Sequence, residues 1–371
     1  MPPVAPMLAK LVRDIPEGQY YEPKWDGFRS VVFRDGDEVE VGSRNERPMT
    51  RYFPELVAAL RAALPDRCVI DGEVIVPSAD GQGLDFWSLQ QRIHPAKSRV
   101  DMLAEKTPAH FVAFDLLALD DGLLVERPFA ERRALLESII PADAPFVHVT
   151  PITQDIAVAR RWFSAFEGAG LDGLIAKRAD LTYQPNKRVM AKIKHERTAD
   201  CVVAGYRVHK TSPDAIGSLL LGLYDDPDES VVPSEMAEWF GETEGSRLVS
   251  VGVVGAFPMA TRKALFEELQ SLVVGFEDHP WSWAAGIASA SSSERSQYGS
   301  RWNGGKDLSF VPLRPERVVE VRYDYMEGFR FRHTAQFVRW RPDRTPESCT
   351  FDQLDTPVPF DLADVLKPGD R

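Results

Sequence analysis

The first half of the chain alternates short apolar runs with stretches of helical periodicity. The runs at residues 28–44, 68–77 and 109–120 are rich in β-branched and aromatic residues, which favours strands. Residues 53–64 and 127–140 repeat apolar residues every three or four positions, as amphipathic helices do. An Asp-Gly pair within residues 34–38 predicts a hairpin turn. The pattern therefore predicts a mixed α+β domain.

The pattern changes after residue 197. Short strand-like runs dominate from there on, at residues 201–208, 217–225, 248–257, 317–325 and 335–342, and a single helix is predicted over 261–273. Five strands and a helix in this length are typical of a small OB-fold β-barrel. A Ser- and Gly-rich stretch, residues 288–307, predicts a loop. We therefore expect two domains, residues 1–197 and 198–371, with no internal repeat.

Composition restricts the class of protein. The chain is 371 residues long with 44% hydrophobic and 27% charged residues, which suits a globular protein with two cores. It contains no apolar run of membrane-spanning length and no signal-peptide layout, so we expect a cytoplasmic monomer. Its three cysteines, Cys68, Cys201 and Cys349, are widely spaced and odd in number, which favours neither a disulfide framework nor a zinc site.

Charge is unevenly distributed. The formal net charge of −12 argues against a protein that coats nucleic acid through bulk positive charge. Residues 317–344, however, are locally basic within an acidic second half. A local basic surface that binds nucleic acid or phosphate is therefore compatible with the sequence.

One short stretch near the N-terminus carries candidate chemistry. In "YYEPKWDGFR", Lys24 lies between Glu22 and Asp26, and an extended strand would place all three on one face. A lysine becomes a nucleophile when burial, neighbouring cations or a metal lower its pKa. A surface lysine paired with two acids fits these residues equally well, so both interpretations stay open at this point.

Further candidates follow in order along the chain. Glu73, on a predicted strand after an Asp-Gly pair, could hold a ribose hydroxyl or a metal, and the Phe114 ring could stack on a purine. Asp172 precedes Lys177 by five residues in "DGLIAK". Lys192 and Lys194 would share one strand face and could meet a phosphate. Taken singly, Phe114 also fits a core residue, and the last two lysines also fit a solvated strand face.

The order of these pieces resembles the covalent nucleotidyltransferases, which include DNA ligases, RNA ligases and capping enzymes. Within them it is similar to the short bacterial ATP-dependent DNA ligases of the LigC type. "KWDGFR", "DGE", "VAFDLL", "DGLIAK" and "KIK" resemble successive family elements, and "FVRWRPDR" resembles the last one. The resemblance covers nearly the whole chain. It implies an adenylation domain followed by an OB-fold domain.

The resemblance also implies a role for each residue. Lys24 would form lysyl-AMP from ATP, and AMP would then activate the 5′-phosphate of a DNA nick before the 3′-hydroxyl seals it, with a role in DNA repair. The implied nucleotide contacts are Glu22 at the adenine edge, Phe114 stacked on adenine, Glu73 on the ribose, Arg29 on ribose or phosphate, Arg44 in a nucleotide-contacting position, and Lys177, Lys192 and Lys194 on the phosphates. Glu73 and Asp172 would hold Mg²⁺ or Mn²⁺.

The last element implies a two-domain mechanism. Arg339, Arg341, Asp343 and Arg344 lie in the predicted barrel and would contact the ATP β- and γ-phosphates only when the barrel closes over the first domain. Closure and reopening are a common gating device. The hinge is expected at residues 194–199.

Two positions differ from the family pattern. Asp172 stands where the family usually has glutamate, and its shorter side chain leads us to expect higher activity with Mn²⁺ than with Mg²⁺. Met190 stands where the family often has tryptophan. Only 23 residues precede Lys24 and no zinc-finger cysteines are present, so ATP is expected in preference to NAD.

Two alternative functions remain at this stage. An RNA ligase or a capping guanylyltransferase would share the same core residues. A non-catalytic nucleic-acid-binding protein is the more remote alternative, because Lys24, Glu73, Lys192 and Lys194 are all present.

Overall fold

The computed structural model describes most of the chain, namely residues 4–226, 230–232, 246–285, 309–354 and 358–366. The predicted loop at residues 288–307 lies outside these residues. Among the described helices, none is long and apolar enough to cross a lipid bilayer.

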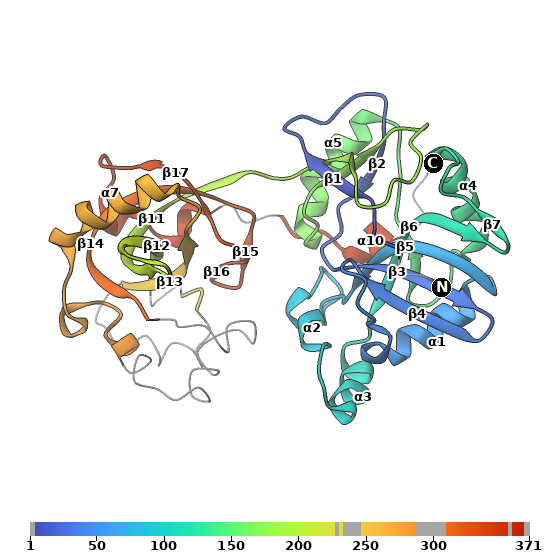
Figure 1. Cartoon of the computed structure of the whole chain (residues 1–371), viewed down its shortest axis with the longest axis horizontal. Coiled ribbons are helices and arrows are strands. Elements are labelled where there is room, and N and C mark those ends of the chain that lie inside the picture. Colours follow the sequence, from blue (N-terminus) through green and yellow to red (C-terminus); the bar gives the residue numbers. More distant parts are fainter. Residues whose placement is uncertain (1–3, 227–229, 233–245, 286–308, 355–357, 367–371) are drawn as a thin grey trace. The chain divides into compact units, whose positions relative to one another are not determined.

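The chain folds into two compact units. One contains Met1–His195 together with Pro357–Arg371, and the other contains Glu196–Thr356. The sequence pattern had assigned everything from residue 198 to the C-terminus to the second domain. That assignment is wrong for the end of the chain, because its apolar side chains are buried in the first unit: Leu362 and Val365 are each 1% exposed. Figure 1 shows their helix, α10 (Leu362–Leu366), among the elements of the first unit.

The larger sheet of the first unit has the strand order β4-β3-β5-β6-β7, with β8 paired to β6. Its strands are β3 (Phe28–Asp35), β4 (Glu38–Ser43), β5 (Arg67–Ile75), β6 (His110–Leu119), β7 (Gly122–Leu123) and β8 (Val147–Val149). The hairpin predicted at residues 34–38 joins β3 to β4, and Asp35 pairs with Glu38 across it. Among the described strands of this sheet, β6 and β8 pair in parallel and the other neighbours are antiparallel.

A smaller sheet of four strands has the order β1-β10-β9-β2. It contains β1 (Leu8–Leu11), β2 (Tyr20–Pro23), β9 (Leu174–Lys177) and β10 (Arg188–Ile193). Strands β2, β9 and β10 carry "YYEP", "LIAK" and "RVMAKI", so this sheet brings together candidate residues that are far apart in sequence.

Helices pack against both sheets of the first unit (Figure 1). The larger helices of this unit are α1 (Pro54–Ala63), α2 (Phe86–Gln91), α3 (Lys97–Lys106), α4 (Phe129–Ile139) and α5 (Ile156–Ala165). Of these, α1, α4 and α5 pack against strands, and α3 packs against α1. The predicted helices at 53–64 and 127–140 correspond to α1 and α4, which pack against β4 and β6 respectively. A short 3₁₀ turn, Phe166–Ala169, follows α5 and leads toward β9.

The second unit is built on a five-stranded antiparallel sheet with the order β13-β12-β11-β14-β17. Its described elements are β11 (Arg197–His209), β12 (Ser212–Asp225), β13 (Arg247–Val254), α7 (Met259–Leu269), β14 (Val311–Tyr323), the β15–β16 hairpin (Met326–Glu327 and Arg330–Phe331) and β17 (Gln336–Trp340). The helix predicted over residues 261–273 corresponds to α7 and the 3₁₀ turn after it, Gln270–Leu272. The unit has a hydrophobic core of its own that includes Trp281.

Candidate active site

Lys24 lies directly after β2 and is held by backbone hydrogen bonds on both sides. Its N–H donates to the carbonyl of Gly173 at 2.9 Å, and its carbonyl accepts from the N–H of Asp172 at 3.0 Å. Its side-chain Nζ lies 2.6 Å from Asp172 Oδ2, and the side chain is 19% exposed. The nucleophile candidate is therefore fixed at its backbone and reachable at its tip.

Asp172 contacts two of the predicted lysines. Its Oδ2 lies 2.6 Å from Lys24 Nζ and 2.8 Å from Lys194 Nζ, and its side chain is 12% exposed. The sequence had suggested a metal ligand here. In the structure the carboxylate pairs with two ammonium groups, and the pair with Lys24 fixes the orientation of that side chain.

Gly27, which follows the "KWD" tripeptide, permits a close approach between the turn and β5. A Cβ at Gly27 would lie 2.2 Å from the carbonyl oxygen of Val74 and 2.9 Å from Glu73 Cγ. Any other residue would push β5 away from the turn. The glycine of the motif thus brings Glu73 close to Lys24.

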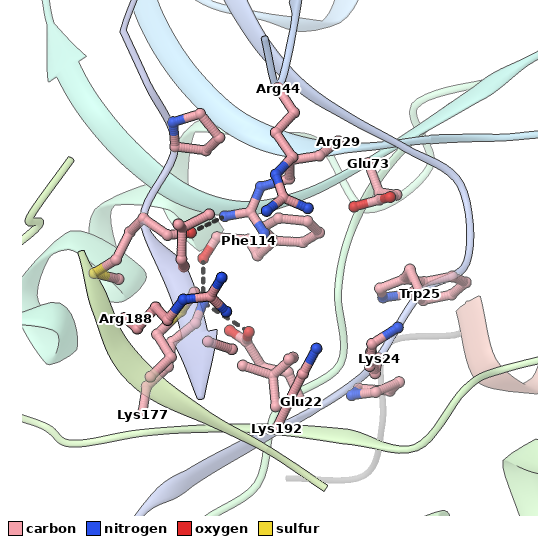
Figure 2. A pocket seen from close by; sticks show the side chains of 17 residues that line it. Glu22, Lys24, Trp25, Arg29, Arg44, Glu73, Phe114, Lys177, Arg188 and Lys192 are labelled. Atoms are coloured by element: carbon pink, nitrogen blue, oxygen red, sulfur yellow. Dashed lines mark hydrogen bonds and ion pairs between the residues drawn. The ribbon is translucent and has the colours of Figure 1, made fainter. Parts of the chain in front are cut away.

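A cavity of about 190 Å³ opens beside Lys24 in the first unit. Figure 2 shows that its walls combine cations, two carboxylates and aromatic rings. Predicted site residues line most of it: Glu22, Lys24, Arg29, Arg44, Glu73, Phe114, Lys177 and Lys192. Trp25 and Arg188 also line it, although the sequence analysis assigned them no role.

Arg29 is held in place by a carboxylate that the sequence analysis missed. Its Nε and Nη2 each donate to Asp71 at 2.6 Å, and the Tyr183 hydroxyl donates to the same carboxylate at 2.7 Å. The Arg29 guanidinium lies over the Phe114 ring, 4.6 Å from its centroid. Asp71 is fully buried, and its place two residues before Glu73 on one strand face was the available signal. Asp71 therefore orients a cation at the cavity wall.

Glu22 and Lys177 form a buried pair across β2 and β9. Lys177 Nζ lies 2.7 Å from Glu22 Oε2, and both side chains are almost fully buried. Arg133 Nη1 donates to Glu22 Oε1 at 3.3 Å from α4. Arg133 Nε also lies 2.9 Å from Glu137 Oε1, so the two cations and two carboxylates of this network compensate one another.

Burial shifts two ionisation equilibria at the cavity. Burial raises the pKa of Glu73 to about 7, although the positive charges of Arg29 and Lys24 oppose the shift. Burial, followed by repulsion from Lys194 and Lys24, lowers the pKa of Lys192. Such shifts are concentrated at functional sites, because catalysis and ligand binding require desolvated charged groups.

The carboxylates present limit how a divalent cation could bind. Within the described part of the chain, no group of three His, Cys, Asp or Glu side chains is close enough to form a metal site. Mg²⁺ usually binds through one or two carboxylates, with substrate phosphates and waters completing its octahedron. Of the two carboxylates predicted as metal ligands, Glu73 lines the cavity, and Asp172 Oδ2 lies within 2.8 Å of Lys24 Nζ and Lys194 Nζ.

The residues of the last family element, "FVRWRPDR", lie in the second unit, where their charged side chains form ion pairs with one another and with nearby acids. Arg341 Nη1 lies 3.0 and 2.9 Å from the two oxygens of Asp200, and Arg339 Nε lies 2.6 Å from Glu320 Oε2. Arg341 also donates to Asp343, and this hydrogen bond lowers the pKa of Asp343 to about 2. Arg344 Nε lies 3.5 Å from Asp200. The basic stretch seen in the sequence is therefore largely compensated by acids within its own unit.

Comparisons with known proteins agree with this arrangement. The family described as "ATP dependent DNA ligase domain" matches residues 6–194, and "ATP dependent DNA ligase C terminal region" matches residues 212–344. DNA ligase C of Mycobacterium tuberculosis is 64% identical over 100% of this chain and 99% of its own. DNA ligase C2 of Mycolicibacterium smegmatis is 66% identical over 96% of each chain.

A solved structure from a study of Lig E DNA ligases shares the fold. It covers 91% of this chain and 99% of its own, with a TM-score of 0.52 and 17% identity. The match across both units, together with the relatives that align end to end, makes the assignment: the chain belongs to the family of ATP-dependent DNA ligases.

Proposed function

We propose that the chain seals nicks in duplex DNA and that Lys24 carries the AMP. After the Lys24 ammonium releases a proton to water, the Nζ lone pair attacks the α-phosphate of ATP. An N–P bond forms while the P–O bond to the leaving pyrophosphate breaks. The AMP then passes to the 5′-phosphate of a nick, and the 3′-hydroxyl displaces it to form the phosphodiester. The observation that carries this proposal is the placement of Lys24 Nζ at a cavity lined by other cations.

Asp172 and Lys194 prepare Lys24 for this reaction. Asp172 holds the Lys24 ammonium by a charge-assisted hydrogen bond at 2.6 Å, which orients Nζ before the nucleotide arrives. Lys194 shares the same oxygen and adds positive charge where phosphate charge develops. The pair therefore contributes orientation together with charge neutralisation, the two main factors in phosphoryl transfer.

The nucleoside binds against Phe114 and the buried Glu22. Phe114 offers its ring at the cavity wall for stacking on adenine, and Glu22 accepts a hydrogen bond from the adenine edge. Arg133 and Lys177 hold the Glu22 carboxylate in place by ion pairs. Arg29, held by Asp71, and Glu73 contact the ribose.

The phosphates lie toward the cationic side of the cavity. Arg44 and Lys192 line it (Figure 2) and neutralise the phosphate oxygens. A divalent cation, held by Glu73 and Asp172 together with phosphate oxygens, would supply further charge neutralisation. Arg339, Arg341, Asp343 and Arg344 of the second unit orient the pyrophosphate during adenylation.

An intact-mass measurement tests the proposal. After incubation with ATP and a divalent cation, the protein gains the mass of one AMP, and Lys24→Ala abolishes this gain. Lys97→Ala is a matched control, because Lys97 is 85% exposed and, among the described residues, its ammonium pairs with Asp101 of its own helix. Covalent AMP on the Lys24→Ala protein would refute the assignment. Parallel assays on nicked DNA and nicked RNA decide whether this chain is a DNA ligase or an RNA ligase.

A further inference from the structure

The C-terminal segment, residues 358–366, lies against the first unit and outside both family matches, which end at residues 194 and 344. Its helix α10 is amphipathic: Leu362 and Val365 are buried, whereas Ala363 and Asp364 are exposed. A helix of five residues is not stable in water by itself. Its helical form therefore depends on the surface that it covers.

That surface includes Trp25, the residue that follows Lys24. Leu362 and Val365 belong to one buried apolar cluster with Trp25, Phe166 and Leu171. The Phe360 ring adds a contact, with its centroid 5.2 Å from that of Phe166. The segment thus packs on the 3₁₀ turn at residues 166–169 that precedes Asp172, and it shares one apolar cluster with Trp25, the residue after Lys24.

The backbone of the segment comes equally close to this loop. A Cβ at Gly168 would lie 1.8 Å from the carbonyl oxygen of Val358 and 2.8 Å from the backbone nitrogen of Phe360. No side chain at position 168 is compatible with the docked segment. Since Gly168 does not have a positive φ, the close approach itself is what requires glycine here.

Any movement of this loop would reach the nucleophile. Lys24 exchanges backbone hydrogen bonds with Asp172 and Gly173, only a few residues beyond Phe166. On the other side of Lys24, Trp25 Nε1 donates to Thr150 Oγ1 at 2.8 Å. The apolar cluster therefore contains the residue next to each member of the Lys24–Asp172 ion pair: Trp25 follows Lys24, and Leu171 precedes Asp172.

We propose that residues 358–366 form a positioning segment for the adenylation step: docking of Leu362 and Val365 holds Trp25 and the 166–173 loop so that Lys24 Nζ is aligned with the α-phosphate. None of residues 358–366 lines the cavity beside Lys24. The segment therefore changes the rate of AMP transfer without changing ATP affinity. This inference rests on the proposed role of Lys24.

Two variants release the segment from opposite sides. Leu362→Asp places a charge in the apolar cluster, and Gly168→Ala obstructs the backbone of residue 358. Gly83→Ala is the matched control, because its Cβ would meet the neighbouring Ala169 carbonyl oxygen at an ordinary 3.4 Å. Leu362→Met is a second control, because it conserves the apolar volume at this position and should leave the segment docked. Hydrogen exchange of amides 358–366 reports whether the segment is released.

Single-turnover adenylation of the full chain provides the functional measurement. We expect Leu362→Asp and Gly168→Ala to lower the rate at saturating ATP about tenfold while the half-saturating ATP concentration stays unchanged. The Gly83→Ala and Leu362→Met variants keep the wild-type rate. A released segment with an unchanged rate, or a loss that appears in ATP affinity, would overturn the inference. AMP retained by Lys24→Ala would instead overturn the role of Lys24, so the two failures are distinguishable.

Discussion

The candidate residues were recognisable in the sequence, but their partners were not. Lys24, Glu73 and Phe114 stand in a linear motif order, and all three line the same cavity. Asp71 and Arg133 act on Arg29 and Glu22 through contacts 42 and 111 residues apart in sequence. Only the fold creates such pairs, so spacing along the chain could not predict them.

Replacing Asp172 tests whether its charge matters. Asp172→Asn keeps the shape and turn preference but removes the ion pairs with Lys24 and Lys194. We predict that nick sealing falls about a hundredfold with either Mg²⁺ or Mn²⁺. Gel-based sealing assays measure this. Near-wild-type sealing by Asp172→Asn would mean that the residue serves only the turn before Gly173.

The length of the same side chain predicts a metal preference. The wild-type protein should seal faster with Mn²⁺ than with Mg²⁺, because Mg²⁺ demands near-ideal octahedral geometry and a short carboxylate supplies it less well. Asp172→Glu should narrow the difference. Equal metal dependence of both proteins would exclude Asp172 from the metal site.

Glu73 makes stability depend on pH in a defined direction. Its pKa is about 7 in the folded protein and 4.5 ordinarily, so between these values the folded state binds more protons than the unfolded state. Stability should therefore fall as pH rises from about 5 to about 7. Thermal midpoints of the wild type and Glu73→Gln, compared at each pH, measure this. The wild type should lose stability relative to the variant across that window, and parallel curves would contradict the buried environment of Glu73.

Among the elements, α4 shows where the hydrophobic pattern was insufficient. Its apolar positions correctly predicted a helix, but Arg132 and Arg133 on it are buried. Arg132 makes a two-point ion pair with Asp115 at 2.7 and 2.8 Å and donates to the Leu181 carbonyl. Arginine normally predicts an exposed face, so only the three-dimensional partners explain why these two are inside.

The parallel strands β6 and β8 carry two histidines whose effect on stability with pH is opposite to that of Glu73. His110 Nδ1 lies 2.9 Å from His148 Nε2, and burial lowers the pKa of each ring to about 4. Between pH 6.5 and 4 the unfolded state binds more protons, so stability should fall as pH drops through this range.

A histidine double variant measures this contribution. His110→Asn combined with His148→Asn should flatten the acid side of the thermal-midpoint profile relative to the wild type. His333→Asn is the control, because His333 is 60% exposed and lies in the second unit. An unchanged acid slope in the double variant would show that these rings do not titrate differently on unfolding.

For the whole molecule, the change in hydrophobic pattern along the sequence predicted two units, but it did not predict that the chain returns to the first unit at its end. The change from mixed α+β to strand-rich sequence near residue 197 falls close to the division after His195. The return of the chain to the first unit depends on Leu362 and Val365, two apolar residues in a short terminal stretch. Such a stretch carries too little periodicity to reveal its partner. The second unit is therefore connected to the first at both of its ends.

This two-unit organisation predicts which reaction step depends on the second unit. If Arg339 and Asp343 act on the pyrophosphate, Arg339→Ala and Asp343→Ala should slow self-adenylation at least tenfold more than sealing of a pre-adenylated nick. Both side chains are about 60% exposed, so neither substitution disturbs a core. Arg314→Ala is the matched control, an exposed arginine of the same unit whose ion-pair partner, Glu316, is also local. Single-turnover assays separate the two steps. Equal losses in both would mean that these residues bind DNA or stabilise the second unit, because pyrophosphate takes part only in the first step.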